Sequence, residues 1–341
     1  MLEIKLHKHD DSLNRTADLF FPANEIDLAE MMNKIDIGIT TEKLCVVDEV
    51  QCDYGGLQSL VGTRANVDEL QYLAKRMDSF DKNEKKTFFA VAEHEKLTEV
   101  KDLINLTFNL HCYALIYDFS DVSHIGRKYE LSRRMTIPLD EMENTDFLTI
   151  GQQLLSGKKR VITSYGVLFH TGNNRELIYN GEQFPEYRWR DDCAAMVVLE
   201  YGDDYSDIKN EYLYLPCSEV EIKKALCRLG AESLYPCYTM LDCDVISEDV
   251  RRIFTEDYPL SEHIETLNKL MQIYVGFDDH SSDDFHAIID MVQPKTPKDV
   301  VLLAENFYEF TVVPQVKTPI DYGRYMIIDS GHYNYDSNLE Q

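Results

Sequence analysis

The sequence has little positive charge and no long apolar run. Its 341 residues contain 34 lysines and arginines against 61 aspartates and glutamates, a formal net charge of −27 at pH 7. Such a chain repels phosphate, so we expect no direct contact with nucleic acid. No apolar stretch approaches the ~18 residues of a membrane span, and residues 1–5 lack the apolar core of a signal peptide. We therefore expect no membrane association.

Motifs for metal binding, phosphate binding and nucleophilic catalysis are also missing. The 8 cysteines form no C-x-x-C pair, which predicts reduced thiols in a cytoplasmic protein. The sequence contains no G-x-x-x-x-G-K-[ST], G-x-G-x-x-G, H-E-x-x-H or G-x-S-x-G. Its 10 histidines are dispersed. We predict that the protein is not an enzyme and carries no cofactor.

Two acidic clusters need a separate test as metal sites. Asp242-Cys243-Asp244 with Glu248 resembles part of a calcium loop, but it lacks the sixth-position glycine and has Ile246 at position five. Residues 277–285 contain four aspartates that could hold a hard cation weakly. A solvated turn between helices is the simpler interpretation of both, so we predict no metal site. A metal-dependent hydrolase remains a third-ranked hypothesis.

The negative charge is concentrated in two stretches of the chain. Residues 1–127 have a net charge of −9 and residues 193–341 a net charge of −17, whereas residues 128–192 have a net charge of −1. The two acidic stretches also align with each other. At an offset of 194, Phe21-Pro22-Ala23-Asn24-Glu25-Ile26 matches Leu215-Pro216-Cys217-Ser218-Glu219-Val220. The offset then becomes 197, where Lys101-Asp102-Leu103 matches Lys298-Asp299-Val300 and Gly126-Arg127 matches Gly323-Arg324. Such a register predicts two homologous domains.

Each copy reads as a small sheet with a helical bundle, and the fold class is therefore α+β. Leu2, Ile4 and Leu6 alternate with polar residues as in a half-buried strand. Asn24 and Ser218 occupy helix-capping positions, and apolar residues recur at helical spacing through the helices that follow. We predict an elongated molecule with repeat 1 at residues 1–130, a connector at 131–192 and repeat 2 at 193–341.

The connector and the ends of the repeats contain turn signals. Residues 161–169 and 176–179 alternate in polarity around Gly172-Asn173-Asn174, which predicts a β-hairpin in the connector. Asn109 and Asn306 each follow a helix and are expected to bond backbone near its end. Gly126 and Gly323 are expected to supply turns with positive φ.

Asp299-x-x-x-Leu303-Ala304-Glu305-Asn306, followed by Tyr322-Gly323-Arg324-Tyr325, resembles the D-x-x-x-LAEN…Y…LGR-Y pattern of ArdA-type antirestriction proteins. Lys101 to Asn109 and Ile125-Gly126-Arg127 look like the same element in the variant found in Firmicutes mobile elements. The resemblance implies an acidic, non-enzymatic DNA mimic that occupies the DNA groove of type I restriction–modification enzymes. This chain is about twice the usual length, and both a monomer and a homodimer are compatible with it.

The predicted partner-binding surface consists of carboxylates expected to be exposed. They are Asp78, Asp81 and Glu84 in the first copy, and Asp203, Asp204, Asp207, Glu248, Asp249, Glu256, Asp257, Asp278, Asp279, Asp283 and Asp284 in the second. The expected partner is a DNA-binding defence protein, either a type I restriction–modification complex or, as an alternative, a CRISPR effector. A second alternative is a non-enzymatic adaptor of a conjugative element that binds another protein through exposed aromatic residues. Binding by mimicry should weaken steeply with salt, whereas an apolar interface should not.

Overall fold

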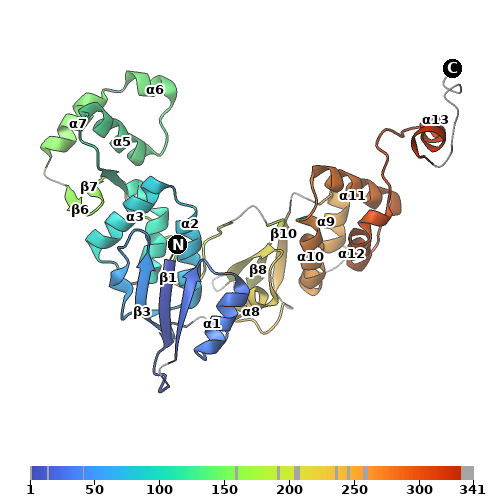
Figure 1. Cartoon of the computed structure of the whole chain (residues 1–341), viewed down its shortest axis with the longest axis horizontal. Helices are drawn as coiled ribbons and strands as arrows, with labels where there is room; N and C mark the ends of the chain where they lie inside the picture. Colours follow the sequence, from blue (N-terminus) through green and yellow to red (C-terminus); the bar gives the residue numbers. More distant parts are fainter. Residues whose placement is uncertain are drawn as a thin grey trace. The chain divides into compact units, whose positions relative to one another are not determined.

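A computed structural model describes residues 2–13, 15–40, 42–157, 160–189, 193–202, 208–234, 237–243, 246–255 and 260–331. Helices and short antiparallel strands alternate along the chain, so the fold is α+β and the sequence-based prediction is confirmed (Figure 1). None of the described helices combines the length and the apolar character needed to cross a membrane.

The first sheet has the order β2-β1-β3-β4 and is antiparallel. Its strands are β1 (Leu2–Lys8), β2 (Thr16–Phe21), β3 (Cys45–Cys52) and β4 (Arg64–Ala65). Leu2, Ile4 and Leu6 are all buried, as the alternating pattern predicts. Between β2 and β3 lies α1 (Glu25–Lys34), whose N-cap Asn24 accepts a hydrogen bond from the Asp27 amide.

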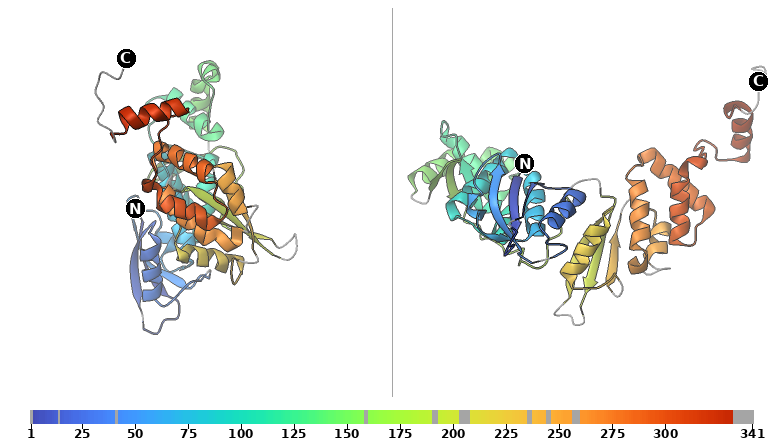
Figure 2. Two further views of the ribbon diagram at one scale, coloured as in Figure 1. Left: turned by 90° about the vertical axis from the view of Figure 1, so that its right-hand side faces the viewer. Right: turned by 60° about the horizontal axis from the view of Figure 1, so that its bottom comes forward.

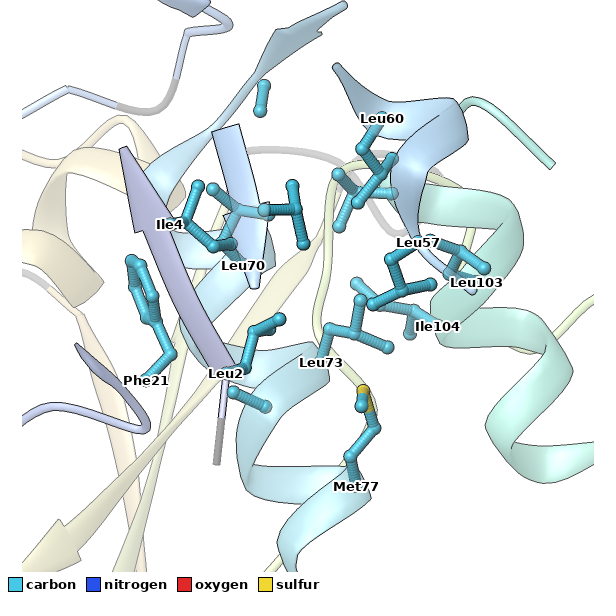
Figure 3. Close-up of a cluster of buried hydrophobic side chains, with 14 of the residues drawn as sticks. Leu2, Ile4, Phe21, Leu57, Leu60, Leu70, Leu73, Met77, Leu103 and Ile104 are labelled. Carbon is cyan, nitrogen blue, oxygen red and sulfur yellow. The ribbon is translucent and has the colours of Figure 1, made fainter. Parts of the chain in front are cut away.

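Three helices share one core with this sheet: α2 (Val67–Asp78), α3 (Lys82–Glu95) and α4 (Val100–Phe108). Their apolar faces and the inner face of the sheet form one core. Figure 3 shows side chains from β1, α2 and α4 in this cluster, among them Ile4, Leu73 and Ile104. Tyr179 of the connector is also buried in it. The connector is therefore part of the first core and not only a link between the repeats.

The connector builds a second antiparallel sheet with the order β5-β7-β6. Its strands are β5 (Tyr113–Ile116), β6 (Val161–Thr163) and β7 (Gly166–His170). The predicted hairpin of residues 161–169 and 176–179 around Gly172 is wrong. The connector contains a shorter hairpin, in which β6 and β7 flank Ser164 and Tyr165. Residues 176–179 form no strand, and their backbone groups bond to the side chains of Asn105 in α4 and of Asn109, which follows α4.

Three helices lie between β5 and β6 in the chain: α5 (Val122–Arg134), α6 (Leu139–Asn144) and α7 (Phe147–Ser156). Of these, α5 packs against β5, and α7 packs against α5. The expected positive-φ turn at Gly126 is wrong, because Gly126 is a buried residue inside α5. A Cβ there would lie 2.0 Å from the Phe147 carbonyl oxygen, and one on Gly151 would lie 2.0 Å from the Val122 carbonyl oxygen. The two glycines let α5 and α7 approach each other closely.

The second copy begins with the same order of two strands, a helix and a strand as the first, but four helices follow where the first copy has β4 and three helices. Its strands are β8 (Ala195–Tyr201), β9 (Lys209–Leu215) and β10 (Tyr238–Asp242), in a sheet with the order β10-β8-β9. Its helices are α8 (Glu219–Leu229), α9 (Glu248–Thr255), α10 (Leu260–Tyr274), α11 (Asp279–Val292), α12 (Pro297–Glu305) and α13 (Pro319–Arg324), and α13 continues as a π-helical segment, Tyr325–Asp329. Gly323 lies inside α13 without a positive φ, so the expected turn is wrong here as well.

Local details also recur at the offset of 197. The helices α3 and α11 have aspartate N-caps, Asp81 and Asp278, and both end at a residue in the left-handed conformation, Lys96 and Gln293. Short 3₁₀ turns, Leu110–Cys112 and Phe307–Glu309, follow α4 and α12.

The chain packs as two compact units, one of residues 1–191 with 197–239 and one of residues 192–196 with 240–341. The second unit contains the bundle α9–α12, shown in orange in Figure 2. The opening strands and α8 of the second copy belong to the first unit. The two units are defined by contacts within the structure, whereas the two repeats are defined by the similarity of their sequences. The predicted boundaries of the repeats therefore stay a prediction.

Candidate anionic surface

The predicted acidic residues of the first copy lie where α2 ends and α3 begins. Asp78, Asp81 and Glu84 are all exposed. Asp81 accepts from the Glu84 amide at 2.8 Å, and the Glu84 carboxylate accepts from the Asp81 amide at 2.8 Å. This capping box satisfies two backbone donors of α3. Asp78 accepts from Trp189 Nε1 at 3.2 Å. All three carboxylates therefore have structural bonds besides their charge.

In the second copy, α11 carries four of the predicted acids at or near its start. Asp278 caps the helix by accepting from the Ser281 amide at 2.8 Å, and hydrogen bonds from Ser281 hold the pKa of its carboxyl below the ordinary value. Asp279 and Asp283 are exposed. Asp284 is half-buried, and its Oδ2 lies 3.9 Å from His280 Nε2.

The exposed acids of α11 form a stripe along one face of the helix. The stripe includes Asp290, which is not among the predicted surface residues. Asp279, Asp283 and Asp290 are one and then about two helical turns apart, and all three are exposed. Neither lysine nor arginine occurs in α11. The carboxylates of Asp279 and Asp283 make no hydrogen bond or ion pair with any described residue. The stripe therefore presents negative charge that is not neutralised locally.

Two more predicted acids, Glu248 and Asp249, are exposed in the first turn of α9. Asp249 lies 3.7 Å from Arg252, whereas Glu248 has no partner among the described residues. Both α9 and α11 pack against α12, so their acids belong to the same bundle (Figure 2).

The remaining predicted residues lie outside the described part of the chain. They are Asp203, Asp204, Asp207, Glu256 and Asp257. Asp244 of the calcium-like segment is also outside it. Among the described residues, no three histidine, cysteine, aspartate or glutamate side chains come close enough to hold a metal ion.

A set of buried charges in the first unit was missed by the sequence analysis. Lys224 of α8 lies 3.0 Å from Asp68 and 3.7 Å from Glu25. Arg228, one helical turn further, lies 3.2 Å from Asp68 and 2.9 Å from Glu211 of β9. We call Glu25, Asp68, Glu211, Lys224 and Arg228 the buried charge cluster. Its carboxylates face internal cations and contribute little to any surface.

Burial raises the pKa of two acids in and beside this cluster. Desolvation raises the pKa of Glu211, although Arg228 opposes the effect. Desolvation also raises the pKa of Glu69, whose Oε1 accepts from the Tyr179 hydroxyl at 3.1 Å. Glu69 Oε2 and Glu211 Oε1 are buried without a hydrogen-bond partner among the described residues. The only sequence signal for this cluster was the spacing of Lys224 and Arg228, which are four residues apart and therefore share one face of α8.

Thiol chemistry has no support in the residues described. Burial raises the pKa of Cys45 to about 12 and also raises the pKa values of Cys52, Cys112 and Cys237. A thiolate is the reactive form of cysteine, so these side chains are poor nucleophiles at neutral pH.

No protein-family model and no curated protein matches this chain. The resemblance to antirestriction proteins therefore stays an expectation from the motifs.

Proposed function

We propose that this chain is a non-enzymatic, acidic DNA mimic that inhibits a host defence nuclease, with type I restriction–modification enzymes as the first target class. The observation that carries the proposal is the face of α11, where Asp279, Asp283 and Asp290 are exposed on a helix without lysine or arginine. A fixed row of unpaired carboxylates attracts a cationic DNA-binding groove and can release its counterions as DNA does.

One helix is too short to replace a duplex. The stripe on α11 extends over about 16 Å at ~1.5 Å per residue, and a duplex of that length carries about ten charges. Three carboxylates supply part of that number. Inhibition therefore requires acids from several elements, and each should contribute a small, screened increment.

The test is competition with duplex DNA for a purified type I restriction–modification complex. The full chain should displace a labelled duplex, and its affinity should fall steeply as salt rises. Simultaneous replacement of four acids, Glu248→Gln, Asp279→Asn, Asp283→Asn and Asp290→Asn, should weaken binding roughly thirtyfold at about 0.5 kcal/mol per charge. The helix caps Asp81, Glu84 and Asp278 are left intact, because their loss would disturb the helices.

A matched variant keeps the charge at the same positions: Glu248→Asp, Asp279→Glu, Asp283→Glu and Asp290→Glu. It should bind as the unaltered chain does. If both quadruple variants lose affinity equally, or if duplex DNA and the chain bind the enzyme together, charge mimicry is wrong. A CRISPR effector examined in the same way tests the alternative target.

A protein–protein adaptor is a second candidate, because large apolar side chains are exposed near the end of the second copy. Tyr308 is 85% exposed and Ile320 is 83% exposed. Binding to a partner that persists at high salt and is unaffected by the quadruple neutral variant would favour this role.

A further inference from the structure

The first copy contains a strand whose edge is covered by the connector. The strand β5 follows α4 and a 3₁₀ turn, and all four of its residues are buried. It pairs antiparallel with β7, with Tyr113 opposite His170 and Ile116 opposite Val167. The edge of β5 therefore has its partner strand within the same chain.

The matching segment of the second copy, residues 310–313, has no such partner among the residues that the structure describes. It follows α12 and a 3₁₀ turn in the same way, and its first residue, Phe310, is extended at φ −95° and ψ 145°, close to Tyr113 at φ −133° and ψ 146°. Its sequence, Phe-Thr-Val-Val, favours a strand. No described strand pairs with it, and Thr311 is exposed. The second copy thus has a strand-forming segment without the strand that covers its counterpart.

An asparagine precedes each of the two segments, Asn109 before β5 and Asn306 before residues 310–313. Asn109 shows how the chain that follows β7 is bound. Asn109 Nδ2 donates to the Glu176 carbonyl oxygen at 2.9 Å, and Asn109 Oδ1 accepts from the Glu176 amide at 2.8 Å. A third bond, from Asn109 Nδ2 to the Asn105 carbonyl oxygen at 2.8 Å, fixes the side-chain amide. Asn109 therefore binds one residue of extended main chain through both of its polar groups.

Asn306 is prepared for the same contact. Its backbone angles are φ −106° and ψ 20°, against φ −114° and ψ 19° for Asn109. Its Nδ2 donates to the Leu302 carbonyl oxygen at 2.8 Å, which matches the bond made by Asn109. Among the described residues, nothing donates to Asn306 Oδ1. Leu302 and Tyr308, which flank it in the sequence, are 57% and 85% exposed.

We propose that residues 310–313 and Asn306 form an acceptor edge for an extended strand of a partner protein. The partner strand adds antiparallel to residues 310–313, as β7 adds to β5, and the chain beyond it is bound by Asn306. Main-chain hydrogen bonds then supply the affinity, and apolar side chains of the strand supply the selectivity. The acceptor edge is independent of the carboxylates on α9 and α11 and goes beyond the proposed inhibition.

A second copy of the same strand does not satisfy this edge. In the first copy, Glu176 lies six residues after His170, the residue opposite the start of β5. If residues 310–313 of a second copy paired in the same register, the residue six positions after Val313 would be Pro319. Proline has no N–H to donate to Asn306 Oδ1. The edge therefore fits a different polypeptide.

The test uses a fluorescent peptide of residues 164–180 of this chain as the probe strand and the full chain as the acceptor. Fluorescence anisotropy should show saturable binding that changes little between low and high salt. Thr311→Pro should abolish it, because Thr311 matches Ala114, which faces Phe169 in the β5–β7 ladder, and proline removes that donor. Asn306→Ala should weaken it about tenfold. Glu309→Gln, an exposed neighbour, should leave the affinity unchanged, and a probe with Phe169→Pro should not bind.

Circular dichroism and thermal unfolding of each variant show whether the fold is retained. The proposal is overturned if the unaltered chain does not bind the probe, or if Thr311→Pro and Asn306→Ala bind it as tightly as the unaltered chain. A dimer in sedimentation that Thr311→Pro dissociates would make a second copy the occupant and would also overturn it. Probe binding that appears only after removal of residues 332–341 would also overturn the proposal, because the chain's own terminus would then occupy the edge.

Discussion

The two copies share the order of their first four elements but differ in what covers them. In the first copy, β5 has a partner strand, and Asn109 binds the main chain of Glu176. The backbone of α7 packs directly against Gly126. In the second copy, residues 310–313 have no described partner strand, and a Cβ on Gly323 would meet nothing within 4 Å. The connector makes this difference, because its strands and helices occur once and pack on the first copy. A repeated sequence therefore does not guarantee a repeated surface.

The two compact units also differ in how some of their charges are used. In the first unit, Asp68 and Glu211 are buried against Lys224 and Arg228. In the second unit, acids on α9 and α11 are exposed. An acid stabilises a fold when it is paired and hydrogen-bonded, and it attracts a distant partner when it is not. The three predictions below test these contrasts.

The largest difference is expected between a buried and an exposed ion pair. Arg228→Met should lower the free energy of unfolding of the first unit by about 3–5 kcal/mol, because the Glu211 carboxylate stays buried without its cation. The matched change in the second unit is Lys269→Met, which removes a pair at 2.6 Å from Glu305 on an exposed surface. It should cost less than about 1 kcal/mol.

Urea unfolding followed by Trp189 fluorescence reports the first unit, since Trp189 is the only tryptophan. Amide hydrogen exchange reports both units separately. Equal losses for the two variants would show that the buried charge cluster is no more important than a surface pair.

An intermediate difference is expected between the two matched glycines. Gly126→Ala places a Cβ where the Phe147 carbonyl oxygen lies, so α7 must shift, at a cost of about 1–3 kcal/mol. Gly323→Ala meets open space in a helix and should stabilise α13 by up to about 1 kcal/mol. Thermal unfolding and hydrogen exchange of the α7 amides measure both effects. Unchanged α7 protection in the Gly126→Ala variant would refute the close contact.

The smallest effect is a pH-dependent contrast between a buried and an exposed acid. Burial raises the pKa of Glu69 above its usual 4.5, so its charged form destabilises the fold increasingly as pH rises above that value. Glu69→Gln should therefore stabilise the chain at pH 7 by on the order of 1 kcal/mol, with a gain that disappears toward pH 4.5. The Gln oxygen can still accept from the Tyr179 hydroxyl.

Asp278→Asn should behave in the opposite way. Hydrogen bonds from Ser281 lower the pKa of Asp278 below its usual 3.8, so its stabilisation is present above that pH and is lost as pH falls further. Thermal midpoints between pH 3 and pH 8 compare the two variants. Parallel pH profiles for Glu69→Gln and Asp278→Asn would contradict the assignment of one acid to the interior and the other to a helix cap.

Much of the local structure could be predicted from the sequence. The alternation of Leu2, Ile4 and Leu6 indicated β1, and capping residues such as Asn24 and Ser218 marked the starts of α1 and α8. These signals depend on neighbours within one or two turns, which are fixed by the sequence itself. The predicted turn at Gly126 was wrong because glycine serves close helix contacts as well as turns, and local sequence does not distinguish the two.

The candidate surface was only partly predictable. Composition gave the excess of carboxylates. The sequence analysis placed residues 277–285 in a turn between helices, which is wrong from Asp279 onward, because Asp279 begins α11 and the helix puts Asp279 and Asp283 on one exposed face. Neither composition nor spacing showed that Asp81, Glu84 and Asp278 accept hydrogen bonds from backbone amides at the starts of helices. Neither showed that Asp68 and Glu211 are buried.

The sequence alone determined the repeat, the types of its elements and the sign of the net charge, because each follows from residue identity and spacing. Tertiary structure decided which acids are buried and which edge of each copy is covered. Asp68 is brought to Arg228 from a part of the chain 160 residues away, and β7 reaches β5 across more than one intervening helix. Such contacts depend on the path of the whole backbone, which no local pattern encodes.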